Sequence, residues 1–239
     1  MPDFAREAEL SQQGCRLVAG VDEAGRGPLA GPVVVAAVIL PGTWPGPLAL
    51  DDSKRLSEAT REVLYGAIRQ HALAWQVRVM SPALIDRVNI LQATLQGMTE
   101  AVTRLRPTPD YVLVDGNRLP TLPVPGEAIV KGDGRSCSIA AASILAKVVR
   151  DRLMRVYGDR YPHWGFAQHK GYGTAEHREA LRRWGPSPIH RRSFRAKDVQ
   201  WKAGQPSDEP ENLSLPGFWS SEDTVSGSGT SAARTARLT

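Results

Sequence analysis

Four acidic residues follow short apolar segments of this sequence. Asp22 and Glu23 come after the first such segment, Asp115 ends a later one, and Asp133 follows a third. If the strands that these segments predict lie side by side, their ends gather carboxylates that repel one another. A hard divalent cation such as Mg²⁺ relieves that repulsion through its oxygen ligands. Two such cations about 3.5–4 Å apart support in-line hydrolysis of a phosphodiester, so the pattern predicts metal-dependent phosphoryl chemistry on a nucleic acid.

Taken singly, each acidic site has a simpler interpretation. Asp115-Gly116 is a pair that turns commonly contain, and Asp22-Glu23 is equally compatible with a solvated strand end. Asp22 and Glu23 are also adjacent, so on a regular strand their side chains point to opposite faces. Both can bind metal only if the strand is distorted there. The functional interpretation therefore depends on these residues occurring together with a basic segment.

The charge of the chain is unevenly distributed. Residues 135–202 hold 15 Lys and Arg against 5 Asp and Glu, a balance of +10, whereas residues 1–134 have −2 and residues 203–239 have −3. Clustered cations gain free energy by displacing the counterions of a phosphate backbone, so the basic segment favours a polyanionic partner. From charge alone, a solvated basic surface accounts for it equally well.

Three further motifs give weaker signals. Gly25-Arg26-Gly27 resembles the start of a dinucleotide-binding loop, but Pro28 and a β-branched segment follow it where a helix is needed. Ser143 and Lys147 have the spacing of a nucleophile pair on a helix, yet packing and capping explain them better. The five histidines have no metal-ligand spacing.

The elements that must position these residues alternate along the chain. The apolar periodicity predicts strands at 16–22, 33–40, 75–80, 111–114 and 128–131. It predicts helices at 58–71, from 81 to a break at 107, at 136–157 and at 175–184. Short connections make the first three strands antiparallel neighbours, and the acidic cluster requires the first and fourth to be adjacent. We therefore expect an α/β fold with a mixed sheet.

The rest of the sequence indicates a cytoplasmic location. No apolar segment is long enough to span a membrane, and the first ten residues carry charges in place of a signal-peptide core. Two cysteines, Cys15 and Cys137, are too few for a disulfide framework. From residue 203 onward Pro, Ser, Gly, Thr and acidic residues dominate, so we predict that 203–239 is a disordered tail.

The motifs, taken together, resemble those of the bacterial type 2 ribonucleases H (ribonuclease HII). The similarity covers about residues 15–198. The matching segments are residues 20–34, 52–54, 114–116, 131–133, 138–147 with Arg150-Asp151, 169–174 and 189–194. The resemblance implies an RNase H-like fold, in which a five-stranded mixed sheet is flanked by helices and carries a C-terminal helical extension. Residues 1–202 would form the catalytic domain.

The resemblance also assigns roles to residues. Asp22, Glu23, Asp115 and Asp133 would hold two Mg²⁺ or Mn²⁺ ions, and Asp151 is the second choice for the fourth carboxylate. Gly25, Arg26 and Gly27 would read the 2′-hydroxyl of a ribonucleotide. Tyr172 would stack on the sugar just past the junction between RNA and DNA. Lys54 and the basic helix face would hold phosphates.

The activity implied is endonucleolytic cleavage of the RNA strand of RNA–DNA hybrids and of duplex DNA that contains ribonucleotides. Cutting on the 5′ side of a single ribonucleotide would leave a 3′-hydroxyl and a 5′-phosphate, in replication and ribonucleotide excision repair. We expect a monomer, and the sequence leaves open whether a replication clamp is a partner. Two alternatives are a junction resolvase-like nuclease of the same fold and a hybrid-binding module without catalysis.

Overall fold

The computed structural model describes residues 1–194, and its centre is one five-stranded sheet in the order β3-β2-β1-β4-β5. The strands are β1 (Val18–Ala24), β2 (Val33–Ile39), β3 (Ala74–Met80), β4 (Tyr111–Asp115) and β5 (Gly126–Ile129). Strands β1, β2 and β3 pair antiparallel, whereas β4 runs parallel to β1 and β5 parallel to β4. The mixed sheet and the adjacency of the first and fourth strands are confirmed.

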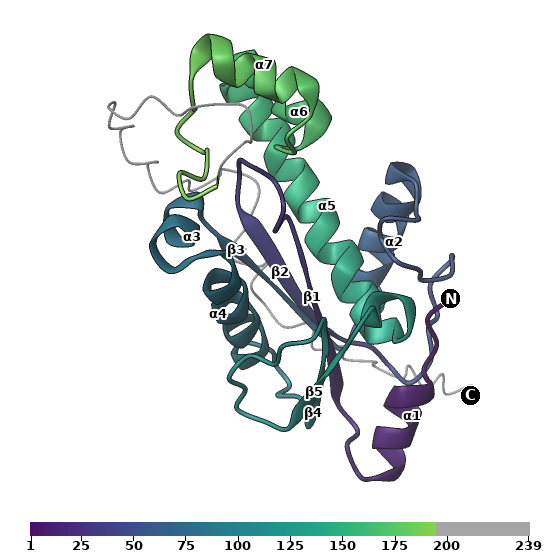
Figure 1. Cartoon of the computed structure of the whole chain (residues 1–239). Helices are drawn as coiled ribbons and strands as arrows, with labels where there is room; N and C mark the ends of the chain where they lie inside the picture. The colour runs from purple at the N-terminus through teal and green to yellow at the C-terminus, as the bar shows by residue number, and fades with distance from the viewer. Residues whose placement is uncertain (195–239) are drawn as a thin grey trace, which may run out of the picture.

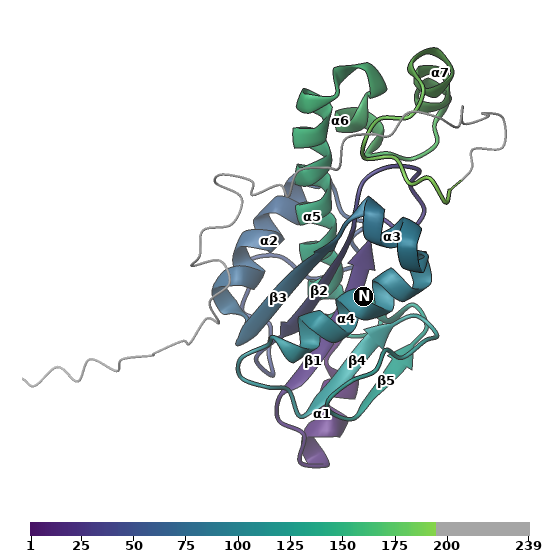
Figure 2. The ribbon, with the colours of Figure 1, turned by 90° about the vertical axis from the view of Figure 1, so that its left-hand side faces the viewer.

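Helices cover both faces of the sheet (Figures 1 and 2). All seven residues of β2 are buried. Val34, Ala36 and Val38 pack with the long helix α5 (Cys137–Arg160), and the alternate residues pack with α4 (Ile90–Thr103) on the opposite face. A strand covered on both faces is apolar throughout its length, which explains the unbroken aliphatic segment in the sequence.

Helix α5 crosses β1 at unusually close range. A Cβ on Gly20 would lie 2.0 Å from the carbonyl carbon of Ser138, so only glycine lets the first turn of the helix approach the strand this closely. Ser136 caps the helix by accepting a hydrogen bond from the N–H of Ile139. The carboxylate of Glu7 accepts hydrogen bonds from the hydroxyl of Ser136 and the N–H of Ser138. These contacts fix the end of α5 that lies nearest the acidic residues.

Several predicted boundaries need correction. The single helix expected from residue 81 is two helices, α3 (Pro82–Val88) and α4, because Asn89 has a φ of 69° and accepts a hydrogen bond from the N–H of Gln92 as a new N-cap. Strand β1 starts later and continues to Ala24, and β5 is shifted two residues toward the N-terminus. The short α1 (Ala5–Gln12) was not predicted.

The C-terminal helical extension projects beyond the sheet at one end of α5 (Figure 1). It contains η2 (Pro162–Trp164), α6 (Phe166–His169) and α7 (Ala175–Trp184), of which only α7 was predicted. Helix α2 (Glu58–His71) packs beside α5, and Ser57 caps it by accepting a hydrogen bond from the N–H of Thr60. Within residues 1–194 no helix is long and apolar enough to cross a membrane. The predicted tail at 203–239 lies outside the described residues.

Candidate active site

The two parallel central strands bring Asp22 and Asp115 to the same level of the sheet. Val21 lies opposite Val114 in the register of β1 and β4, so Asp22 and Asp115 occupy the next position on neighbouring strands. Residues at one level of adjacent strands point to the same face. Pairing with β2 continues through Ala24, with Glu23 opposite Val35, so the ladder lacks the distortion that was expected if Asp22 and Glu23 both bind metal. The charge of Asp115 nevertheless acts on Glu23.

Burial and mutual repulsion raise the pKa of three of the four carboxyl groups. The Asp22 side chain is almost completely buried, and this burial, with the charges of Glu23 and Asp115, raises its pKa well above the ordinary value. Burial also raises the pKa of Glu23, where the charge of Asp115 adds to the effect and Arg26 opposes it. For Asp115, burial and then the charge of Asp133 raise the pKa. The structure therefore brings these four carboxylates within electrostatic reach of one another.

Asp133 is held against the end of β4 by a short turn. It lies in η1 (Gly132–Gly134), where the N–H of Gly132 donates a hydrogen bond of 2.6 Å to Oδ1 of Asp115. Lys54 Nζ lies 3.3 Å from Oδ2 of Asp133. Partial burial by itself lowers the pKa of Lys54, but the charges of Asp133, Asp52 and Asp22 outweigh that effect and raise it. An ammonium group thus lies beside the acidic cluster.

The donor set fits hard divalent cations. All four groups supply carboxylate oxygens, the ligands that Mg²⁺ and Mn²⁺ take, and the raised pKa values record negative charge that lacks compensation. Within residues 1–194, no three His, Cys, Asp or Glu side chains are already close enough together to hold an ion. The side chains of Asp22, Glu23, Asp115 and Asp133 would therefore have to turn toward a cation.

Asp151 lies in a different setting. Its Oδ1 accepts a hydrogen bond of 2.7 Å from Lys147, and its Oδ2 lies 3.9 Å from Arg61. The neighbouring cations of α5 are paired in the same way, since Arg152 donates to Glu62 and Arg155 to Glu58 on α2. On this part of the helix face expected to bind phosphates, the basic side chains thus form ion pairs, within α5 for Lys147 and with α2 for Arg152 and Arg155.

The loop at residues 25–27 is supported from beneath by two buried arginines. Arg191 is fully buried and donates hydrogen bonds to the carbonyls of Gly25, Arg26, Pro28 and Gly31, at 2.6–2.9 Å. Gly25 has a φ of +97°, and a Cβ on it would lie 1.9 Å from Nε of Arg150. Glycine is thus required by both the backbone conformation and the space.

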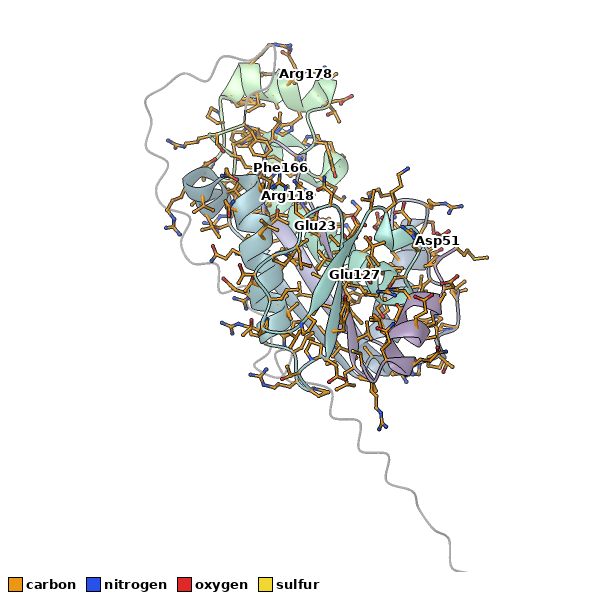
Figure 3. All side chains as sticks on the ribbon, turned by 60° about the horizontal axis from the view of Figure 1, so that its bottom comes forward. Glu23, Asp51, Arg118, Glu127, Phe166 and Arg178 are labelled. Atoms are coloured by element: carbon orange, nitrogen blue, oxygen red, sulfur yellow. The ribbon has the colours of Figure 1, made fainter. Side chains whose placement is uncertain are left out.

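Tyr172 reaches the same loop from the C-terminal extension. A Cβ on Gly27 would lie 3.8 Å from Cε1 of Tyr172, and the guanidinium of Arg150 lies 5.9 Å from the centre of the tyrosine ring. The ring remains 45% exposed, so a ligand can still stack on it. Figure 3 labels Glu23 at the end of the sheet and Phe166 in the extension that carries this loop.

The sequence analysis did not identify Arg150 and Arg191 as site residues. Both lie in segments that supported the family resemblance, but their basic character suggested contact with solvent or phosphate. Arg150 donates to the carbonyls of Pro32, Ala30 and Lys170 and is 1% exposed. An arginine in the midst of an apolar helix pattern was the available signal, because a buried guanidinium needs several acceptors.

Ser143 lies beside the acidic cluster. Its hydroxyl lowers the pKa of Asp22, against the effect of burial.

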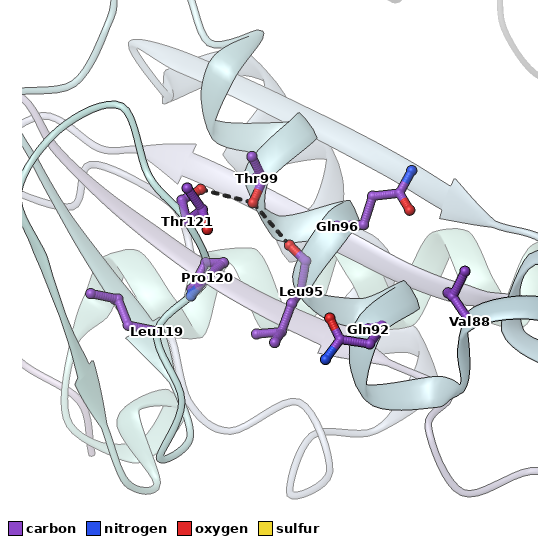
Figure 4. A pocket seen from close by; sticks show the side chains of 8 residues that line it. All are labelled: Val88, Gln92, Leu95, Gln96, Thr99, Leu119, Pro120 and Thr121. Atoms are coloured by element: carbon purple, nitrogen blue, oxygen red, sulfur yellow. Dashed lines mark hydrogen bonds between the residues drawn. The ribbon is translucent and has the colours of Figure 1, made fainter.

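A separate groove of about 500 Å³ lies between α4 and the loop at 119–121 (Figure 4). Its lining includes Gln92, Gln96 and Thr99, and the hydroxyl of Thr99 donates to the carbonyls of Leu95 and Thr121. None of the acidic residues lines this groove, so it is not the site described above.

Comparison with known proteins gives a consistent result. The family model described as Ribonuclease HII matches residues 19–197. Ribonuclease HII of Geobacter sulfurreducens is 58% identical over 191 residues, which cover 79% of this chain and 87% of that protein. Ribonuclease HII of Syntrophotalea carbinolica is 54% identical over 189 residues, covering 79% and 90%. Among solved structures, the complex of PCNA with RNase HII from Archaeoglobus fulgidus matches with a TM-score of 0.62 and 26% identity, over 77% of this chain and 98% of that chain.

Proposed function

This chain belongs to the ribonuclease HII family, enzymes that cleave RNA in RNA–DNA hybrids, and from that premise we propose that it also cuts duplex DNA at single embedded ribonucleotides. Hydrolysis on the 5′ side of the ribonucleotide leaves a 3′-hydroxyl and a 5′-phosphate. The observation that carries the proposal is that the acidic cluster at the ends of β1 and β4 continues directly into a glycine loop, where a Cβ on Gly27 would lie 3.8 Å from Tyr172. Hydrolytic groups and groups suited to a sugar thus lie within one site.

The carboxylates of Asp22, Glu23, Asp115 and Asp133 hold two Mg²⁺ or Mn²⁺ ions in this proposal. Such ions, when bound, supply a nucleophilic water at neutral pH and stabilise charge on the leaving oxygen. The rigid backbone of β1 and β4 fixes Asp22 and Asp115, while η1 presents Asp133 from a turn that is tied to Asp115. Burial of Asp22 excludes bulk water from one side of the cluster.

Recognition of the ribonucleotide falls to Gly25, Arg26 and Gly27. Without side chains at 25 and 27, the backbone can approach the sugar closely, and the 2′-hydroxyl is the group that distinguishes RNA from DNA. Arg191 holds the carbonyls of Gly25 and Arg26, so their peptide groups keep a fixed orientation. Tyr172 stacks on the sugar of the nucleotide that follows the ribonucleotide, and this stacking is compatible with a deoxyribose at that position.

Lys54 binds a phosphate of the substrate in this proposal. Its side chain is 76% exposed and its ammonium already lies beside Asp133, so a phosphate at the acidic cluster can share this cation. Phosphate contacts of this kind position a duplex without reading its sequence.

A protein partner is a separate question. The archaeal relative was solved in a complex with PCNA, so a sliding clamp is the partner to test. A pull-down with the full chain, and with residues 203–239 removed, makes that test.

The decisive experiment is cleavage of a duplex that contains one ribonucleotide, with Mg²⁺ added or withheld. Asp22→Asn and Asp115→Asn should abolish cutting while circular dichroism shows an intact fold. A variant that still cuts contradicts the assignment of that residue. An all-deoxy duplex and an all-DNA four-way junction serve as controls, because cutting of the junction would favour the resolvase alternative. Binding without turnover by the unmodified protein would favour the non-catalytic alternative.

A further inference from the structure

Three histidines cluster beneath the loop that carries Tyr172. His177 and His190 are buried, with 0% and 3% exposure, and His169 stacks on His177 with 4.4 Å between ring centres. Nε2 of His177 lies 2.9 Å from Nε2 of His190, and Nδ1 of His177 lies 2.9 Å from the carbonyl oxygen of Tyr172. The two imidazoles therefore connect the backbone of Tyr172 to the segment around Ser187.

The hydrogen bonds determine which nitrogen of each ring carries the proton. The backbone N–H of Ser187 can only donate, so Nδ1 of His190 accepts, at 2.8 Å. A neutral His190 then carries its proton on Nε2 and donates to Nε2 of His177. His177 must in turn carry its proton on Nδ1, from which it donates to the carbonyl of Tyr172. Every hydrogen bond in this series has one donor and one acceptor only when both rings are neutral.

His169 holds the preceding residue by the same logic. The N–H of Gly171 donates to Nδ1 of His169 at 3.1 Å, so the proton of His169 lies on Nε2, which donates to the carbonyl of Trp164 at 2.6 Å. Burial favours the neutral rings: it lowers the pKa of His177 to about 4 and of His190 to about 3, and it lowers the pKa of His169. The charged side chains that act on the cluster are those of Glu176 and Lys170, which have opposite effects on the pKa of His169.

The same loop is held on its other side by the segment after Gly27. The N–H of Leu29 donates to the carbonyl of Gly171 at 2.9 Å, and Arg150 donates to the carbonyl of Lys170 at 3.0 Å. A Cβ on Gly171 would lie 2.5 Å from the carbonyl oxygen of Ala30. The histidines thus complete the set of contacts that fixes the backbone at Tyr172, while its ring stays exposed beside Gly27.

We propose that His177 and His190 are positioning residues for the reaction: their series of hydrogen bonds fixes the carbonyl of Tyr172 and so holds the tyrosine ring where it stacks on the substrate sugar. The role of the ring itself rests on the proposed function. The histidines touch neither the substrate nor the acidic cluster in this arrangement. They act on catalysis only through Tyr172.

The first test uses variants of His177 on the single-ribonucleotide duplex. His177→Phe keeps an aromatic ring but removes the donor to Tyr172, and we expect kcat to fall about tenfold with KM changed less than about twofold. His177→Asn is the matched control, because its amide can donate from the position of Nδ1, and it should retain most of the activity. Equal loss in both variants would overturn the proposal.

A double-mutant cycle separates this inference from the proposed function. If His177 acts through the tyrosine ring, His177→Phe should lower kcat less than about twofold further in a Tyr172→Ala background. If the kcat losses of the two single variants multiply in the double variant, the positioning role is overturned while the proposed role of Tyr172 stays intact. If Tyr172→Ala alone leaves cleavage of the single-ribonucleotide duplex unchanged, the proposed role of the tyrosine ring is wrong, and the positioning role of His177 is wrong with it.

A third measurement needs no variant and is unaffected by folding defects. Long-range ¹⁵N–¹H spectra of the full chain at pH 7 report the protonated nitrogen of each histidine. We expect protonated Nδ1 for His177 and protonated Nε2 for His190 and His169. A different tautomer at His177 or His190 would overturn the proposed series of hydrogen bonds.

If His177→Phe fails to fold, His190→Gln and His190→Leu repeat the comparison. Only His190→Gln retains a donor to His177.

Discussion

Lys54 holds its ammonium nitrogen 3.3 Å from a carboxylate oxygen of Asp133, although the two residues are 79 positions apart in the chain. The lysine comes from the loop before α2 and the aspartate from the turn after β5. One exposed cation thus compensates part of a buried negative cluster. Arg26 compensates another part of that charge through its ion pair of 3.5 Å with Glu23. With so few cations at the cluster, the site should respond measurably to the loss of a single carboxylate or of the Lys54 ammonium.

Asp22→Asn should make the protein more stable without metal and inactive with it. Burial and the charges of Glu23 and Asp115 raise the folded-state pKa of Asp22, so ionisation of this carboxyl lowers stability as pH rises through that pKa. Removing the ionisable group should therefore raise the free energy of unfolding and the Tm in the absence of metal. Thermal unfolding in EDTA measures this change. Asp159→Asn, at an exposed position on α5, should leave both stability and cleavage unchanged.

Lys54→Gln should weaken cleavage with little effect on folding. Its side chain is 76% exposed, so its ion pair contributes little to stability. Loss of a phosphate contact should lower kcat/KM about tenfold and reduce the salt slope of binding by about one. Titrations at several salt concentrations measure the slope. Arg55→Gln is the control, because Arg55 pairs with Asp51 instead, and an equal effect in both variants would contradict the specific role of Lys54.

Gly25→Ala should disrupt the loop to which we assign recognition of the ribose, whereas Gly14→Ala should not. Both glycines have a φ near +97°, so each alanine costs about 1 kcal/mol of backbone strain. Only at Gly25 does the new Cβ meet another group, the buried side chain of Arg150, and nothing lies within 4 Å of a Cβ on Gly14. We expect near-complete loss of cleavage for Gly25→Ala alone. Full activity of that variant would show that the loop can move without penalty.

Stability should decrease as pH falls below about 6.5, through the buried histidines. The pKa of His177 is about 4 in the folded protein, so an unfolded chain with an ordinary histidine binds more protons in this range. The contribution lost between pH 7 and pH 5 is about 2 kcal/mol. His177→Asn lacks this group, so the difference in Tm between the two proteins should shrink on acidification. A constant difference would mean that the pKa of His177 is the same in the folded and the unfolded protein.

The sequence predicted what depends on local pattern. The apolar periods located all five strands, and the helices predicted at 58–71 and 175–184 have the bounds of α2 and α7. It could not predict the break at Asn89, because the choice between one helix and two depends on packing against the sheet. It also did not separate the buried Arg150 from the half-buried Arg152, since both are arginines on one helix. Their environments come from distant residues, the carbonyls near Gly31 and the carboxylate of Glu62.

Arg191 has a consequence for how the enzyme is made. It donates to the carbonyl of Gly25, which precedes it by 166 residues. During synthesis, β1 to β4 and their carboxylates leave the ribosome well before this arginine does. An incomplete chain that contains the acidic residues therefore still lacks the hydrogen bonds that hold the carbonyls of Gly25 and Arg26. In the proposed function, selection of a ribonucleotide thus depends on a residue that is synthesised after all four proposed metal ligands.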